Sequence, residues 1–186
     1  MRYRVQKKAY LTRSVLILLC SFLLPGLLLA LMYMVNGFYP FGEKSLLIMD
    51  LSDQYVEFYS GLFYYGENSN VLFSWSKGYG QNYIGLFAYY LSSPFSILVL
   101  LFPQSEITVA LLWINLLKVA CCGLTFAVFL HEWSQRWDWT KVFFSTAYAL
   151  MSYNIVYSMC LMWLDGVIWL PIVLCGVLRV LRRDRP

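Results

Sequence analysis

The sequence predicts an all-α integral membrane protein, on the evidence of its composition and of its apolar runs. Of the 186 residues, 60% are hydrophobic and only 13% are charged, whereas about a quarter of the residues of a soluble domain are charged. Several apolar runs approach the roughly 20 residues that a helix needs to cross a bilayer. The basic residues lie mainly near the two ends, as charges that flank membrane spans do. Membrane lipids are therefore expected partners, and nucleic acid is not.

The first expected span covers residues 14–35. Basic residues precede it and no acidic residue does, so the positive-inside rule places the N-terminus in the cytoplasm. A cleaved signal peptide shares the basic start and the apolar run. This run is long, however, and no small-residue cleavage site follows it, so we expect an uncleaved span.

Residues 36–82 form the only long stretch that is not clearly embedded in the membrane. Within it, apolar residues recur every three or four positions from Ser45 to Tyr65, which predicts an amphipathic helix lying on the membrane surface. In such a helix Asp50, Asp53 and Glu57 would share the polar face. The solvated face of an interfacial helix explains Glu57 well, but Asp50 is flanked by apolar residues and is a candidate functional group.

Residues 83–102 are apolar but contain Pro94, which interrupts a helix. Further spans are expected at residues 107–130, 142–159 and 163–180.

The number of crossings fixes which loops lie outside. The basic C-terminal end, around Arg182, should be cytoplasmic. Counting back, residues 131–141 are cytoplasmic, and residues 36–106 begin and end on the outer side. Residues 83–102 are then a re-entrant or interfacial pair of short helices, tolerated only where buried in protein or lining a cavity. The opposite parity, with 83–102 a full span, would place Asp165 in the cytoplasm and the basic end outside.

This topology places Asp50, Asp53 and Asp165 at the outer face, where all three can share one cavity. Asp165 lies at the outer end of a span and is equally suited to be a helix N-cap.

Two lysines are candidates for binding an anion. Lys118 lies midway along its span, where an ionisable side chain is costly unless paired. A carboxylate or a lipid phosphate would pair it, and a structural hydrogen bond is the alternative. Lys77, in the sequence KGYG, could present a cation and backbone amides to a phosphate, although a plain turn explains this sequence as well.

The cysteines and the histidine do not indicate a metal or redox site. The five cysteines lie in apolar runs without C-x-x-C spacing, which is typical of small buried side chains. The one histidine, His131, lacks the second histidine of a zinc-helix motif.

The order of several motifs resembles a known family. The sequences NGFYPFG, DLSDQY, SWSKGYGQN and YYLSSPFS are followed by the span around Lys118 and by MWLDG. From residue 36 onward the chain is similar to the N-terminal part of bacterial YfhO-type membrane proteins, a branch of the GT-C superfamily of polytopic glycosyltransferases. The resemblance implies GT-C-like N-terminal transmembrane helices and a long first extracytoplasmic loop that carries interfacial helices.

The resemblance also implies an activity and a location. Such proteins are multi-pass proteins of the bacterial plasma membrane. They transfer a sugar from a polyprenyl-phosphate donor to a cell-envelope polymer, such as teichoic acid in Gram-positive bacteria. Inverting transfer needs a base for the acceptor hydroxyl and positive charge near the departing phosphate, but no enzyme nucleophile.

The family's site residues map onto the motifs of this chain. A catalytic acid in the first outer loop matches Asp50, or Asp53, and a second acid after the third span matches Asp165. Substrate-binding roles are implied for Gln54 and Tyr55 of the DLSDQY motif, and for Lys118 and Lys77 near the phosphate. Some GT-C relatives bind a divalent metal through these acids and others use none, so the metal is left open.

One departure from the family concerns length. Such enzymes have many more spans, so residues 1–186 are expected to be a single transmembrane domain of a truncated form. Two other functions stay open. A transporter or channel-like subunit would also use an intramembrane lysine, a broken segment and buried acids. A non-catalytic truncated paralogue is the third possibility.

Overall fold

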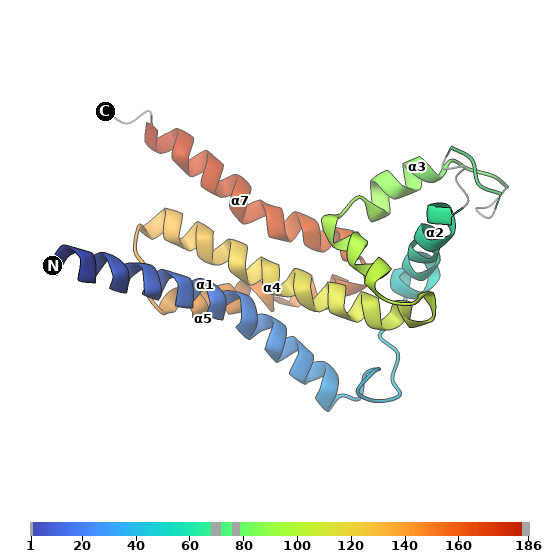
Figure 1. Cartoon of the computed structure of the whole chain (residues 1–186), viewed down its shortest axis with the longest axis horizontal. Helices are drawn as coiled ribbons and strands as arrows, with labels where there is room; N and C mark the ends of the chain where they lie inside the picture. The colour runs from blue at the N-terminus through green and yellow to red at the C-terminus, as the bar shows by residue number, and fades with distance from the viewer. Residues whose placement is uncertain (1, 68–71, 76–78, 184–186) are drawn as a thin grey trace. The chain divides into compact units, whose positions relative to one another are not determined.

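The computed structural model of the protein describes residues 2–67, 72–75 and 79–183 (Figure 1). Helices dominate these residues, and the strand-like pairs among them are two isolated bridges, Phe38–Lys44 and Ser74–Gln81. The expected all-α class is therefore confirmed. Across the described part of the chain, three helical stretches are long and apolar enough to cross a membrane. They are Tyr10–Val35, Gln104–Ser134 and Leu161–Arg182.

The chain forms two compact units. The bundle unit comprises residues 1–32, 116–158 and 163–186, and the loop unit comprises residues 33–115 and 159–162.

In the bundle unit, α1 (Arg2–Val35) and α4 (Ile107–Ser134) pack closely and antiparallel. A Cβ atom built on Gly26 would lie 3.3 Å from the Cβ of Ala120, and one built on Gly123 would clash with the carbonyl oxygen of Ser21. Small residues allow the backbones of membrane helices to approach in this way. The two glycines therefore explain why α1 fits against α4.

The other bundle helices continue an up-and-down arrangement. α5 (Thr140–Ala149) runs back along α4, since the rings of Phe126 and Tyr148 stack with their centroids 4.2 Å apart. α7 (Leu161–Arg183) then runs parallel to α4, and the guanidinium of Arg179 lies 3.0 Å from the carboxylate of Glu132. The C-terminal ends of α4 and α7 and the N-terminal half of α1 thus lie at one end of the bundle unit.

The expected span 142–159 is not one continuous helix. α5 ends at Ala149, and two short helices follow, α6 (Ser152–Val156) and η5 (Tyr157–Met159). At the break, the amide of Asn154 donates to the carbonyl oxygen of Ala149 at 3.0 Å and replaces a helical hydrogen bond. That this segment crosses the membrane stays a prediction.

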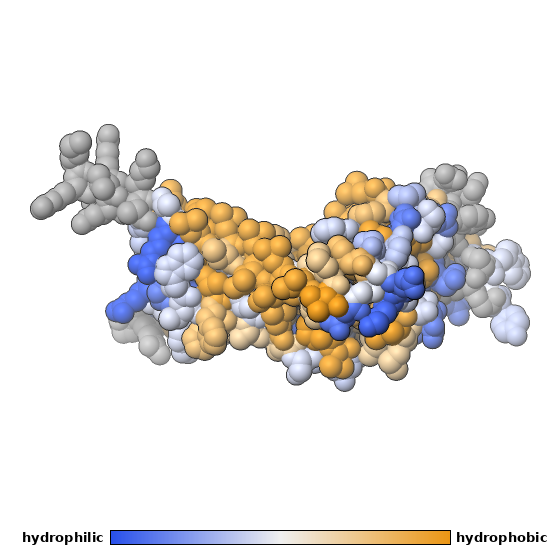
Figure 2. All heavy atoms as spheres, turned by 90° about the horizontal axis from the view of Figure 1, so that it is seen from below, coloured by the Kyte–Doolittle hydropathy of each residue, from blue (hydrophilic) through white to orange (hydrophobic). Residues whose placement is uncertain are grey.

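From Val15 onward, the exposed side chains of α1 are mainly apolar. Figure 2 shows a continuous hydrophobic area, with hydrophilic side chains gathered at its left. A surface of this kind suits contact with the hydrocarbon core of a bilayer. The exposed apolar residues of α1 include Leu11, Val15, Leu16, Leu19, Leu23, Leu27 and Leu31.

In the loop unit, the amphipathic helix begins later than its periodicity predicts. Residues 45–48 are not helical, and Met49 has a positive φ of 45°. A π-helical turn, η1 (Leu51–Tyr55), leads directly into α2 (Val56–Glu67). Leu51, Tyr55 and Tyr59 are buried, so this helix packs one apolar face onto the unit.

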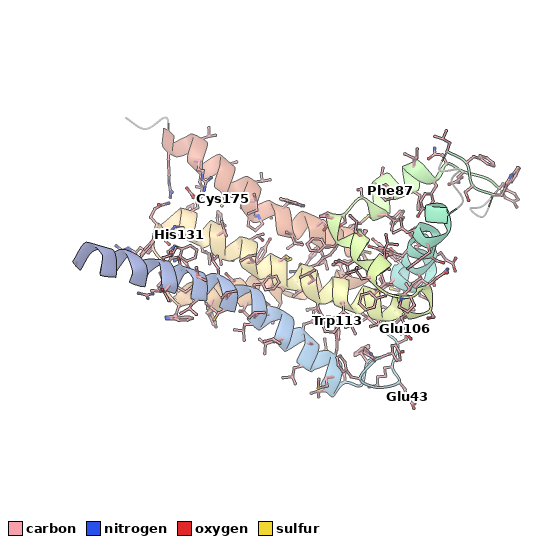
Figure 3. All side chains as sticks on the ribbon, in the orientation of Figure 1. Glu43, Phe87, Glu106, Trp113, His131 and Cys175 are labelled. Carbon is pink, nitrogen blue, oxygen red and sulfur yellow. The ribbon has the colours of Figure 1, made fainter. Side chains whose placement is uncertain are left out.

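The apolar segment 83–102 is bent. α3 (Tyr83–Leu86) and η2 (Phe87–Leu91) form one arm, and η3 (Pro94–Leu101) forms the other at an angle of 100°. The break falls where Pro94 predicts it, and a re-entrant placement in the membrane stays a prediction. The short η4 (Gln104–Glu106) then leads into α4, and Glu106, labelled in Figure 3, accepts a hydrogen bond of 3.2 Å from the Tyr39 hydroxyl.

Candidate functional site

Asp50 is the centre of a hydrogen-bonded chain in the loop unit. Its Oδ1 accepts a hydrogen bond from the amide of Gln54 at 3.1 Å, and its Oδ2 accepts one from the Cys160 thiol at 3.4 Å. The Oε1 of Gln54 in turn accepts a hydrogen bond of 2.8 Å from the Tyr90 hydroxyl. Asp50 is half-buried, so both of its oxygens are held in place while part of the carboxyl group stays accessible.

The environment of Cys160 keeps it a donor. Burial, followed by the hydrogen bond to Asp50 and the charge of Asp50, raises the pKa of this thiol to about 11. A thiolate next to the carboxylate would be repelled by it, so Cys160 stays protonated near neutral pH. The carboxylate of Asp50 thus accepts hydrogen bonds from two neutral donors, the Gln54 amide and the Cys160 thiol.

Tyr55 lies in the core beside this chain. Its ring stacks on Tyr59 and meets Tyr90 edge-on, with ring centroids 6.4 and 5.6 Å apart. Its hydroxyl oxygen accepts a hydrogen bond of 3.3 Å from the backbone N–H of Met162, and burial raises its pKa. Tyr55 therefore holds residues 159–162, which include Cys160, against η1. Its expected substrate-binding role stays a prediction.

An open cleft with a volume of about 450 Å³ lies next to the Asp50 chain. Tyr90 belongs both to its wall and to the hydrogen-bonded chain, so one side chain joins the cleft to Gln54 and Asp50. The lining residues are Gln81, Asn82, Gly85, Leu86, Tyr89 and Tyr90.

The three acids of the opening motif have different surroundings. Asp53 and Glu57 are exposed, whereas Asp50 is half-buried and bonded at both oxygens. That the three carboxylates share one face stays a prediction, because the helix begins only at Asp50 and its first turn is π-helical. Lys77, expected near a phosphate, lies outside the described residues.

Lys118 and Asp165 form an ion pair inside the bundle unit. The ammonium nitrogen of Lys118 lies 2.8 Å from Oδ2 of Asp165, and the side chains are 1% and 19% exposed. A carboxylate or a lipid phosphate was expected from the sequence as the partner of Lys118, and in the structure the carboxylate of Asp165 pairs with it. Asp50 belongs to the loop unit and Asp165 to the bundle unit, so their joint action at one cavity stays a prediction.

Within the described ranges, no group of three or more histidine, cysteine, aspartate or glutamate side chains is arranged to hold a metal ion. We therefore assign no chemical step to a metal.

Two residues of the Asp50 chain were missed from the sequence. Tyr90 lies in the YYLSSPFS motif, and Cys160 lies close before MWLDG, but Cys160 was interpreted only as a small apolar side chain. The only sequence feature that could have pointed to these two residues is that each lies in or beside one of the motifs.

Comparison with protein families identifies a match. The family described as bacterial membrane protein YfhO matches residues 21–186. No curated protein and no solved structure matches the chain.

Proposed function

Because the chain belongs to the family of bacterial YfhO membrane proteins, we propose that it takes part in sugar transfer from a polyprenyl-phosphate donor to a cell-envelope polymer such as teichoic acid. The observation that carries this proposal is the half-buried Asp50, held by Gln54 and Cys160 beside a cleft. A fixed, accessible carboxylate is suited to accept a proton from a hydroxyl group.

The proposed reaction is a single displacement. The acceptor hydroxyl gives its proton to Asp50, and its oxygen forms a bond to the anomeric carbon of the sugar. The bond between that carbon and the phosphate oxygen breaks, and polyprenyl phosphate leaves with the bonding electrons. One displacement inverts the anomeric carbon and needs no covalent enzyme intermediate.

The roles of the two lysines differ in this proposal. Lys118 is buried and paired with Asp165, so its direct contact with a phosphate would require the ion pair to open. Lys77 is the other cation that the sequence offers for the departing phosphate.

We also propose an orientation for the bundle unit. Arg136, Arg179 and Arg182 lie towards the end where α4 and α7 finish, and the positive-inside rule assigns such an end to the cytoplasm. Fourteen positions separate Asp165 from Arg179, which corresponds to roughly 20 Å at the rise of an α-helix. Asp165 and Lys118 would then lie in the outer half of the bilayer, with the N-terminus cytoplasmic.

The test is turnover of a polyprenyl-phosphate sugar by membranes that contain the protein, with radiolabelled donor and envelope polymer as acceptor. We expect Asp50→Asn to abolish transfer while membrane expression is unchanged. Glu57→Gln removes an exposed carboxylate from the same helix and should leave transfer intact. Loss of transfer in Asp53→Asn instead would assign the base to Asp53, and transfer like the wild type in both aspartate variants would refute the carboxylate base.

A transport function is the second candidate, and the buried ion pair of Lys118 with Asp165 favours it. Ion pairs in spanning helices often mark a substrate or proton path. Solute uptake into vesicles that carry the protein, lost in Lys118→Met and accompanied by no sugar turnover, would establish transport in place of transfer.

A further inference from the structure

We infer that the cleft beside Asp50 binds an uncharged sugar ring. This inference rests on the proposed function and assigns a substrate class to one defined place in it. The described lining contains two carboxamides, two tyrosines, a glycine and a leucine, and no charged side chain. A bound phosphate or carboxylate would be recognised by arginine, lysine or several backbone amides, and the described lining side chains offer no such cation.

The polar lining matches the hydroxyl groups of a sugar. Each hydroxyl both donates and accepts a hydrogen bond, and a carboxamide offers both kinds of partner. The Oδ1 of Asn82 already accepts a hydrogen bond of 2.6 Å from the Gly85 N–H, which turns its NH₂ group into the available donor. The backbone of Gln81 is fixed by a pair of hydrogen bonds with Ser74, at 2.7 and 3.1 Å, so its carboxamide projects from a defined position.

The tyrosines supply an apolar face. Tyr89 is 63% exposed, and its ring meets that of Tyr90 edge-on with centroids 4.8 Å apart. The C–H face of a pyranose packs on such a ring, because an aromatic side chain offers a large apolar face at low entropic cost. A volume of about 450 Å³ lies within the roughly 300–1,000 Å³ of small-molecule sites.

Gly85 keeps the cleft in this form. A Cβ atom at this position would lie 2.8 Å from Oδ1 of Asn82, so a larger residue would displace the Asn82 side chain. The position of the cleft is also suited to the reaction. Tyr90 connects it to Asp50 through Gln54, so two hydrogen-bonded side chains link a sugar in the cleft to the proposed base.

The test measures binding without turnover. Purified protein in lipid nanodiscs, free of glycoside detergents, is titrated by ligand-observed saturation-transfer NMR. The probes are the methyl glycosides of glucose, galactose and N-acetylglucosamine, with glycerol 1-phosphate as the charged comparison. We expect saturation transfer to at least one neutral glycoside that Tyr89→Leu weakens, whereas Tyr89→Leu should leave any transfer to glycerol 1-phosphate unchanged.

Three variants locate the site. Tyr89→Leu removes the aromatic face and should weaken binding about threefold to tenfold, the range expected for one aromatic contact. Gln81→Glu keeps the shape of the side chain but removes its NH₂ donor, and should also weaken binding. Phe87→Leu is the control, because Phe87 lies on the same η2 segment (Figure 3), is 42% exposed and does not line the cleft.

The outcomes separate this inference from the proposed function. Glycoside binding that is weakened by Tyr89→Leu and unchanged by Phe87→Leu supports the site, even if the turnover assay fails. Glycoside binding that both Tyr89→Leu and Gln81→Glu leave unchanged would overturn it, as would glycerol 1-phosphate binding that Tyr89→Leu weakens. Asp50→Asn should abolish transfer but keep glycoside binding, since Asp50 does not line the cleft.

Discussion

At the residue scale, two carboxylates of one motif, Asp50 and Asp53, have different surroundings. Asp50 and Asp53 are three positions apart, yet only Asp50 has donors on both oxygens. One of these donors, Cys160, comes from more than a hundred residues later in the chain. No periodicity in the sequence connects the two, which is why the sequence could not distinguish Asp50 from Asp53.

Burial, together with the contact to Asp50, should make the Cys160 thiol react slowly. In a variant with the other four cysteines changed to alanine, we expect maleimide to label Cys160 slowly at pH 8. A pKa of about 11 in place of the usual 9.0 leaves roughly one-hundredth as much thiolate. Labelling rates in the native and the denatured protein measure this difference.

Asp50→Asn is the matched variant for the thiol. Removing the carboxylate charge should lower the pKa of Cys160 and raise its labelling rate by about threefold to tenfold at constant pH. Raising the pH from 8 to 9 should increase the native rate about tenfold, since both values lie below the folded pKa. A rate that Asp50→Asn leaves unchanged would show that the two side chains do not interact.

The ion pair of Lys118 and Asp165 yields a second prediction at this scale. Asp165→Leu alone removes the carboxylate 2.8 Å from a buried ammonium group and should destabilise the protein by about 3 kcal/mol. Replacing both residues, as Lys118→Met with Asp165→Leu, should restore most of this loss, because no buried charge then lacks its counterpart. Thermal unfolding in one detergent compares the variants. A double variant no more stable than Asp165→Leu would contradict the prediction.

At the scale of the elements, the packing of α1 on α4 depends on Gly123, which has no side chain. Gly123→Val should lower the stability by about 1–3 kcal/mol, as overpacking does, because a Cβ atom would clash with the Ser21 carbonyl oxygen. Gly176→Ala on α7 is the control, since a Cβ atom there meets nothing within 4 Å. The midpoint of thermal unfolding measures both. Equal midpoints would show that α1 and α4 are not closely packed at Gly123.

Of two helix breaks in the structure, only one could be predicted from the sequence. The bend between η2 and η3 was predictable, because Pro94 lacks an N–H group and restricts the residue before it. The break between α5 and α6 was not, since residues 142–159 contain no proline or glycine. It depends on the side-chain amide of Asn154, which donates hydrogen bonds to the carbonyl oxygens of Tyr148 and Ala149. Such local competition with helical hydrogen bonds depends on packing as well as on sequence.

At the scale of the whole molecule, the topology depends on two segments that are not single long helices. The bent pair, 83–101, is a full crossing or a re-entrant segment. Residues 142–159 are divided among α5, α6 and η5, and they too either cross the membrane or return to the same side. Together they decide on which side each candidate residue lies, because each full crossing changes the side of everything after it.

Three single cysteines, in a variant without native cysteines, resolve both choices. Glu43→Cys precedes the bent pair, Arg136→Cys follows α4, and Trp163→Cys follows the α5–η5 segment. All three positions are exposed. A maleimide that cannot cross membranes is applied to intact cells, and we expect it to label positions 43 and 163 but not 136. Position 136 should react only after the cells are permeabilised.

Each departure from this pattern has a single meaning. If positions 43 and 136 react from the same side, an even number of crossings separates them, and the bent pair must cross together with α4. If positions 136 and 163 react from the same side, the α5–η5 segment does not cross. Either result would change the side on which Asp165 lies relative to Asp50, and so refute their action at one outer cavity. The expected pattern requires α4 to be the only full crossing between positions 43 and 136, which is the arrangement that a shared outer site needs.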